Sequence, residues 1–151
     1  MYRRTFLTAA AALMVARPLS AESFEITLTD DEWRARLSDA QFAVLRQEGT
    51  EPAGSSPLDA EKRSGTYVCA GCDLPVFQSA TKFDSGTGWP SFYQPIQGAV
   101  GTKSDPGLFG SRTEVHCSRC GGHLGHVFDD GPQPTGLRYC MNGVAMKFVA
   151  A

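Results

Sequence analysis

Four of the five cysteines in this 151-residue chain are arranged in two C-x-x-C pairs. Thiolates at this spacing are typical metal ligands, and four of them form the closed tetrahedral site of structural zinc. The two pairs lie further apart than in a compact zinc ribbon, so a metal would join distant loops and restrict the long segment between them. The expected ligands are Cys69, Cys72, Cys117 and Cys120.

Other interpretations of the two pairs remain open from the spacing alone. A C-x-x-C pair is also typical of thioredoxin-like redox sites, although that motif opens a helix after a strand in a βαβ unit. Disulfides form in oxidising compartments, and an odd number of cysteines would then leave one thiol over. Because both pairs share one spacing, a structural metal is favoured. Zinc is the expected ion, and iron is its main competitor for thiolate ligands.

The fifth cysteine, Cys140, lies between polar neighbours. Arg138 and Asn142 are each two residues away, and in a strand these three positions share one face. A guanidinium beside a thiol lowers the thiol pKa and favours the reactive thiolate. The alternative is an inert cysteine, since free cysteines often fill apolar cores.

Two histidines, His123 and His126, follow directly after the second cysteine pair. Histidines three residues apart can bind a metal or act as acids near neutral pH, although each one taken alone is as often structural. His116, which precedes Cys117, is expected at the surface or as a support for the metal ligands.

A glycine-rich segment with aromatic residues, GTGWPSF, occupies residues 86–92. Trp89 and Phe92 fit either the hydrophobic core or the wall of an apolar pocket. Loops rich in glycine carry binding residues more often than core segments do, so both interpretations stay open.

The motifs occur in the order C-x-x-C, GWPSF, C-x-x-C, HLGHVFDDGP and RYCMNG. This order strongly resembles the methionine sulfoxide reductase B family, the peptide-methionine (R)-S-oxide reductases, from about Phe24 to Val149. The resemblance implies a mainly β fold with two antiparallel sheets, short N-terminal helices and a four-cysteine metal clip remote from the active site. It also implies that oxidised proteins and peptides carrying methionine-R-sulfoxide are the substrates.

The resemblance further implies a role for each candidate residue. Cys140 matches the catalytic nucleophile, and His123 and His126 match the histidines that protonate the sulfoxide oxygen. General acid help of this kind is worth about 10²–10⁴-fold. The product would be methionine and a sulfenic acid on Cys140. The positions that match substrate-binding and supporting residues are Trp89, which packs the substrate methyl group, Arg138 and Asn142.

One position departs from many members of that family. Where they carry a resolving cysteine before the GWPSF motif, this chain has Thr87. With four cysteines bound to metal, no cysteine remains as a partner for Cys140. We therefore predict a one-cysteine cycle, in which an external thiol protein such as thioredoxin reduces the sulfenic acid directly.

Local signals also predict the elements that position these groups. Thr29 and Glu32 have capping-box spacing, and Ser38 and Gln41 repeat it, so two short helices are expected near the start of the mature chain. Gly49 is expected to end the second helix. A loop rich in proline, glycine and serine follows at residues 50–57.

From residue 65 onward, short apolar runs alternate with glycine and proline. This alternation favours an antiparallel β fold over βαβ units. The expected strands include residues 66–68, 99–100, 114–115 and 146–149.

The first 21 residues predict an export signal that is separate from the folded domain at residues 22–151. Arg3 and Arg4 precede a short apolar segment and small residues, which resembles a twin-arginine signal. We place cleavage after Ala21, with Ala16 as the second candidate. The twin-arginine route carries folded proteins, which suits a chain that takes up a metal before export. We therefore expect a periplasmic protein.

Charge and composition narrow the class of partner. The net charge is −2 for the full chain and about −5 without residues 1–21, which disfavours nucleic acid. No apolar run reaches the roughly 18 residues of a membrane span, so membrane contact is expected only during export. A monomer is the default expectation. The competing functions are a non-enzymatic zinc-knuckle binding module and another thiol enzyme, such as a peroxide reductase or a cysteine hydrolase.

Overall fold

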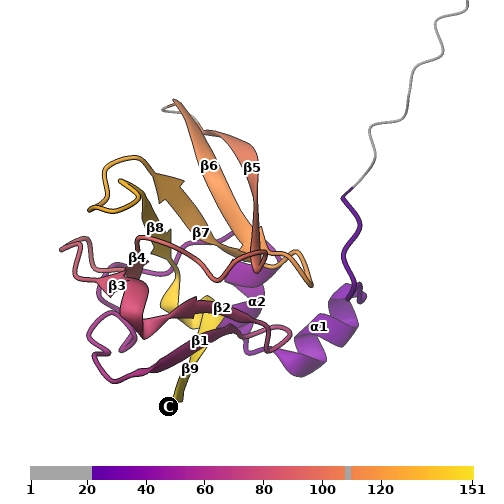
Figure 1. The fold of residues 1–151 in the computed structure, drawn as a ribbon. Coiled ribbons are helices and arrows are strands. Elements are labelled where there is room, and N and C mark those ends of the chain that lie inside the picture. Colours follow the sequence, from indigo (N-terminus) through magenta and orange to yellow (C-terminus); the bar gives the residue numbers. More distant parts are fainter. Residues whose placement is uncertain (1–21, 108–109) are drawn as a thin grey trace, which may run out of the picture.

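The computed structural model describes residues 22–107 and 110–151, so the predicted export signal lies outside the described residues. The described chain contains two antiparallel sheets and two short α-helices, as the resemblance implied (Figure 1). Neither of these helices, nor any other in the described segments, is long and apolar enough to cross a membrane.

The first helix, α1 (Asp30–Arg36), begins where the capping box predicted. The Thr29 side chain accepts a hydrogen bond from the Glu32 amide, and the Glu32 carboxylate accepts one from the Thr29 amide at 2.8 Å. This exchange satisfies amides that have no partner within the helix. Trp33 is the buried residue of α1 and attaches it to the core.

The second helix, α2 (Asp39–Leu45), is capped in the same way by Ser38 and Gln41. It ends at Leu45, four residues before the glycine that was expected to end it. Glu48 adopts the left-handed conformation with φ 55°, and the Gly49 amide donates back to the Ala43 carbonyl at 2.9 Å. The chain therefore turns away one helical turn earlier than the glycine suggested.

The sheets differ in size and both contain non-consecutive neighbours. The smaller sheet has the order β2-β1-β9, and the larger has the order β3-β4-β8-β7-β6-β5. The two short 3-10 helices are η1 (Ser79–Thr81) and η2 (Gly143–Ala145). The strands are β1 (Gly65–Cys69), β2 (Pro75–Gln78), β3 (Lys82–Phe83), β4 (Ser91–Phe92), β5 (Val100–Gly107), β6 (Gly110–Cys117), β7 (His123–Phe128), β8 (Arg138–Met141) and β9 (Met146–Ala150).

The expected strands overlap four of these elements, two of which are much longer than predicted. Residues 66–68 and 146–149 correspond closely to β1 and β9. Residues 99–100 and 114–115 mark only small parts of β5 and β6, which pair over eight residues each. Most of this hairpin is polar and exposed, so it lacks the apolar alternation that identifies a strand in sequence.

The hydrophobic core lies between the two sheets. Phe77 of the smaller sheet stacks on Phe92 of the larger sheet, with ring centroids 4.4 Å apart. Tyr67 meets Phe92 edge to face at 4.9 Å. Phe92 is fully buried, which settles it as a core residue rather than part of a pocket wall.

The register of the larger sheet aligns four polar side chains across four strands. Glu114 of β6 pairs with His126 of β7, His126 pairs with Cys140 of β8, and Cys140 pairs with Ser91 of β4. Directly opposed residues of antiparallel strands project from the same face. We call Glu114, His126, Cys140 and Ser91 the transverse row.

Candidate active site and metal centre

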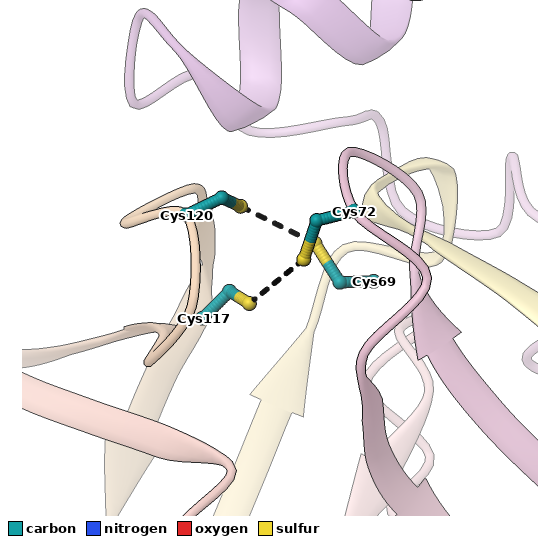
Figure 2. A group of neighbouring side chains, drawn as sticks. All are labelled: Cys69, Cys72, Cys117 and Cys120. Carbon is teal, nitrogen blue, oxygen red and sulfur yellow. Dashed lines mark hydrogen bonds between the residues drawn. The ribbon is translucent and has the colours of Figure 1, made fainter. Parts of the chain in front are cut away.

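The four paired cysteines meet at one point, where Figure 2 shows their sulfurs converging from two loops. All four Sγ atoms lie within 4.8 Å of one another. The Cys69 and Cys120 sulfurs are 3.8 Å apart, and those of Cys72 and Cys117 are 3.5 Å apart. The predicted cluster is therefore assembled from the end of β1 and the end of β6.

The spacing of these sulfurs fits a metal ion. Four thiolates about 2.3 Å from a common tetrahedral centre stand about 3.8 Å from each other. All five cysteines are free thiols, which excludes the disulfide interpretation for this structure. Because β1 and β6 belong to different sheets, an ion at this cluster would hold the two sheets together.

Cys140 is half-buried on β8, with Arg138 two residues away on the same face. Burial raises the pKa of the Cys140 thiol above its usual value. The positive charge of Arg138 and hydrogen bonds from Thr87 and Arg138 act in the opposite direction. The expected effect of the guanidinium is present, but burial outweighs it.

The Arg138 side chain is held rigidly beside the thiol. Its Nε and Nη2 atoms donate to the two carboxylate oxygens of Asp130, both at 2.8 Å. The guanidinium also lies over the Phe128 ring, 4.4 Å from its centroid. A bidentate ion pair of this kind fixes the direction of the guanidinium as well as its position.

His123 is buried, and its two ring nitrogens have different surroundings. Nδ1 donates to the Glu114 carboxylate at 2.9 Å, whereas no described residue hydrogen-bonds Nε2. Glu114 also accepts from His116 Nδ1 at 3.3 Å and lies 3.5 Å from the Lys103 ammonium. Burial raises the pKa of Glu114, but hydrogen bonds from His116 and His123 outweigh it and lower the pKa. The carboxylate is therefore ionised at neutral pH.

Nε2 of His126 is hydrogen-bonded, in contrast to Nε2 of His123. Nε2 donates to Asp105 Oδ2 at 2.7 Å, and the same oxygen accepts from Arg112 at 2.8 Å. Burial lowers the pKa of His126 despite the opposing bond to Asp105, so the ring is neutral near pH 7. The His123 and His126 rings lie edge to face, 5.3 Å apart.

The two histidines line a polar pocket of about 340 Å³ between the β5–β6 hairpin and the segment after α2. Both acidic and basic groups line its walls, and such a pocket suits a polar reacting group such as S=O. The other lining residues are Glu48, Lys103, Ser104, Asp105, Pro106, Arg112 and Glu114.

Trp89 and Asn142 are linked through hydrogen bonds to the main chain of Glu51. Trp89 Nε1 donates to the Glu51 carbonyl at 3.1 Å, and the Glu51 amide donates to Asn142 Oδ1 at 3.0 Å. Asn142 Nδ2 donates to the Leu124 carbonyl at 3.1 Å, so both of its polar side-chain atoms hold main chain. β8 ends at Met141, and Asn142 follows it with extended backbone.

Sequence reasoning missed several residues that the structure places at the site. Strand pairing brings them in from other parts of the chain, so no local spacing indicates them. His116 was expected at the surface or supporting the metal ligands; it is buried against Glu114 and Phe24. The missed residues are Glu51, Asp105, Glu114 and Asp130.

A cavity of about 690 Å³, larger than the polar pocket, is a separate apolar groove along α2, the loop at residues 50–58 and β9. None of the predicted site residues lines it, although Glu51 forms part of its wall. Size alone therefore does not identify the reactive centre in this fold.

Comparison with known proteins assigns the family. Residues 37–150 match the family model described as the SelR domain. The chain is 50% identical over 127 residues to the peptide methionine sulfoxide reductase MsrB of Leptospira interrogans, covering 83% of this chain and 97% of the relative. It is 53% identical over 125 residues to the protein of that name in Pseudomonas putida, covering 82% and 94%.

A plant relative is longer than this chain. Peptide methionine sulfoxide reductase B1, chloroplastic, of Oryza sativa is 53% identical over 126 residues, which cover 83% of this chain and 59% of the rice protein. The matches span β1 to β9 and so include both cysteine pairs, both histidines and Cys140. The chain belongs to the methionine sulfoxide reductase B family.

Proposed function

We propose that this protein reduces methionine-R-sulfoxide in peptides and proteins to methionine, with Cys140 as the nucleophile. The observation that carries the proposal is the pairing of Cys140 with His126 across β7 and β8, beside the fixed guanidinium of Arg138. Relatives at about 50% identity are named peptide methionine sulfoxide reductases, which supports the same reaction here.

The reaction transfers one oxygen atom between two sulfurs. The Cys140 thiolate attacks the electrophilic sulfur of the sulfoxide, whose oxygen is protonated, and an S–S bond forms. The substrate S–O bond then breaks as the hydroxyl passes to the Cys140 sulfur, and breakage of the S–S bond releases the thioether. Overall, a thiol and a sulfoxide give a sulfenic acid on Cys140 and the thioether of methionine. Cys140 is oxidised by two electrons, and the substrate sulfur is reduced by two.

His123 is the better candidate for the proton donor. Its Nε2 atom has no partner among the described residues, and the ionised Glu114 carboxylate at Nδ1 balances the charge of an imidazolium. His126 is tied to Asp105 through Nε2 and is neutral near pH 7. We assign His126 to binding the oxygen once a substrate displaces that contact.

Trp89 supplies the apolar wall of the substrate site. The half-buried indole is held by its hydrogen bond to the Glu51 carbonyl, so its face has a fixed direction. A wall of this kind accepts the methyl group of the substrate and leaves the polar oxygen toward the histidines. We assign the preference for the R epimer to this placement of the methyl group against Trp89 and of the oxygen toward the histidines.

The sulfenic acid is reduced by an external thiol donor. Four of the five cysteines converge on the metal cluster, and Thr87 occupies the loop beside Cys140. Two thiols of the donor convert the sulfenic acid to a thiol and water and leave as a disulfide. A thioredoxin-like protein has this chemistry.

We propose that the four-cysteine cluster holds structural zinc. All four ligand positions are filled by Cys69, Cys72, Cys117 and Cys120, so the ion would keep no open position for substrate. The ion supplies structural stability, whereas Cys140 and the histidines perform the chemistry.

We also propose that residues 1–21 direct export by the twin-arginine route and that the enzyme works in the periplasm. The paired arginines, the short apolar segment and the small residues near position 21 support this. A reporter fused behind residues 1–21 is expected outside the cytoplasm and, after Arg3 and Arg4 are both changed to Lys, inside it. A wild-type fusion that stays in the cytoplasm would overturn the proposal.

The decisive experiment measures turnover of peptide-bound methionine-R-sulfoxide and methionine-S-sulfoxide with dithiothreitol as the reductant. Wild-type protein is expected to consume the R epimer only, and Cys140→Ser neither. Absence of turnover by folded, metal-loaded wild-type protein would refute the proposed function.

A further inference from the structure

Three hydroxyl groups form a hydrogen-bonded chain that leads toward the reactive thiol. Ser91 Oγ donates to the Trp89 carbonyl at 3.1 Å and lies 2.7 Å from Ser85 Oγ. Ser85 Oγ in turn lies 2.8 Å from Thr87 Oγ1, and the Thr87 hydroxyl lowers the pKa of Cys140. We call Thr87, Ser85 and Ser91 the hydroxyl chain.

The hydroxyl chain is built by two different parts of the fold. Ser91 lies on β4 directly opposite Cys140 and is fully buried. Ser85 and Thr87 lie in the loop before β4, where Gly86 and Gly88 adopt positive φ values of 70° and 87°. These two glycines allow the loop to fold back over the strand, because side chains rarely adopt that conformation.

Counting hydrogens gives the direction of each bond. The chain contains three links, from the Trp89 carbonyl to Ser91, from Ser91 to Ser85 and from Ser85 to Thr87. A hydroxyl has one hydrogen to donate, so the three hydroxyls supply one hydrogen for each link. The carbonyl can only accept, so with a neutral thiol every hydrogen points away from the sulfur.

Loss of the thiol proton adds the thiolate as a fourth acceptor for three hydroxyl hydrogens. The bond from Ser91 to the Trp89 carbonyl is the longest of the three links, at 3.1 Å, and is the weakest of the hydroxyl bonds. If that bond breaks, the three hydroxyls rotate together, and Thr87 donates to the thiolate. Bond rotation alone makes this change, with no movement of the main chain.

We propose that the hydroxyl chain is a reversible donor relay, in which Thr87 hydrogen-bonds the Cys140 thiolate and Ser85 and Ser91 control the direction of the Thr87 hydrogen. Thr87 is then a catalytic residue that contacts the reacting sulfur, and the two serines are positioning residues. The inference rests on the proposed role of Cys140 as the nucleophile.

The relay predicts effects of opposite sign for two neighbouring substitutions. Thr87→Val removes the donor and keeps the shape, so the thiolate loses a charge-assisted hydrogen bond. Ser85→Ala removes the acceptor that competes for the Thr87 hydrogen, so Thr87 points to the sulfur at all times. If these residues only supported the loop, both substitutions would shift the pKa of Cys140 in the same direction.

Other groups around the thiol are unchanged in both variants. The charges that face Cys140 are those of Arg138 on β8 and Asp130 in the loop before it, and His126 on β7 is neutral near pH 7. Because neither substitution touches these groups, a change in the pKa of Cys140 reports the hydroxyl chain.

The experiment measures the pKa of Cys140 through the pH dependence of its alkylation by iodoacetamide, followed by mass spectrometry of the peptide that contains it. Alkylation of Cys140 needs no sulfoxide and no reductase activity. Its result can therefore contradict the relay without contradicting the proposed function. The metal-loaded chain is compared as wild type, Thr87→Val, Thr87→Ser and Ser85→Ala, with metal content as the check of folding.

We expect Thr87→Val to raise the pKa of Cys140 by about one to two units, and Thr87→Ser to restore the wild-type value. We expect Ser85→Ala to lower the pKa by about half a unit to one unit. An unchanged pKa in Thr87→Val, or a raised pKa in Ser85→Ala, would overturn the relay.

Discussion

The Glu114 carboxylate lies 2.9 Å from Nδ1 of His123, and both side chains are almost completely buried. The two residues belong to neighbouring strands, β6 and β7, so the sheet itself holds them together. An ionised acceptor at Nδ1 fixes the ring orientation, and Nε2 has no hydrogen-bond partner among the described residues.

The first prediction concerns this pair. Glu114→Gln keeps a hydrogen-bond acceptor of the same size but removes the negative charge opposite His123. Because acid catalysis is worth about 10²–10⁴-fold, we expect kcat to fall about tenfold or more with little change in KM. Steady-state kinetics on a peptide sulfoxide measures both parameters.

Glu48→Gln is the matched control for that variant. Glu48 lines the same pocket and pairs with the same Lys103 side chain at 2.6 Å, but it is exposed, and His123 Nδ1 bonds Glu114 instead. Its kcat should stay close to the wild-type value. An equal loss of kcat in the two variants would assign the effect to Lys103 rather than to the histidine.

The second prediction concerns acid stability. Hydrogen bonds from His116 and His123 lower the pKa of Glu114 in the folded state, so its contribution to stability is present above the unfolded value near 4.5. That contribution is lost as pH falls through the folded pKa. The midpoint of urea unfolding should therefore fall more steeply below pH 4.5 in wild type than in Glu114→Gln, and equal slopes would contradict this.

The third prediction concerns pH dependence at the nucleophile. The positive charge of Arg138 opposes the effect of burial on the pKa of Cys140. Arg138→Met should raise that pKa further, so the rise of kcat/KM with pH moves to higher pH. One unit would reduce kcat/KM at pH 7 about tenfold.

Arg138→Lys tests whether charge is the cause, because it keeps the cation without the bidentate contact to Asp130. Its pH profile should lie between those of wild type and Arg138→Met. A uniform loss of kcat/KM at every pH in Arg138→Met would assign the residue to substrate binding instead.

The fourth prediction concerns the loop position beside the thiol. Thr87→Cys places a second thiol where the hydroxyl now contacts Cys140, so one equivalent of sulfoxide should leave an intramolecular disulfide. Intact mass after a single turnover should show the loss of two hydrogens. Wild type should instead accumulate a sulfenic acid that a dimedone probe labels at Cys140.

The fifth prediction concerns the metal cluster. Cys72→Ser removes one of four ligands that join the two sheets, and we expect loss of the ion and a decrease in unfolding free energy of about 5 kcal/mol or more. Chemical denaturation and metal analysis measure the two effects. Cys140→Ser is the control, since it should lose activity while keeping the metal and the stability.

Local chemistry in the sequence predicted part of this site. The capping boxes at Thr29 and Ser38, the four clustered cysteines and the shared face of Arg138 and Cys140 all depend on spacings within a few residues or on a known ligand chemistry. These features need no knowledge of which strands pair.

The remaining features depend on register between distant strands. Glu114 and Asp105 reach the histidines only because β5, β6 and β7 pair as they do, and the Asn142 side chain bonds main chain of Glu51 and Leu124, which lie far away in the sequence. No local pattern specifies these partners.

The transverse row makes catalysis sensitive to strand alignment. Successive residues of a strand face opposite sides, so a shift of β7 by one residue against β8 would turn His126 away from Cys140. A misaligned molecule would then be inactive rather than slow. In a refolded or heat-stressed sample, activity per accessible Cys140 thiol would therefore measure the fraction of molecules in which the larger sheet has the correct register.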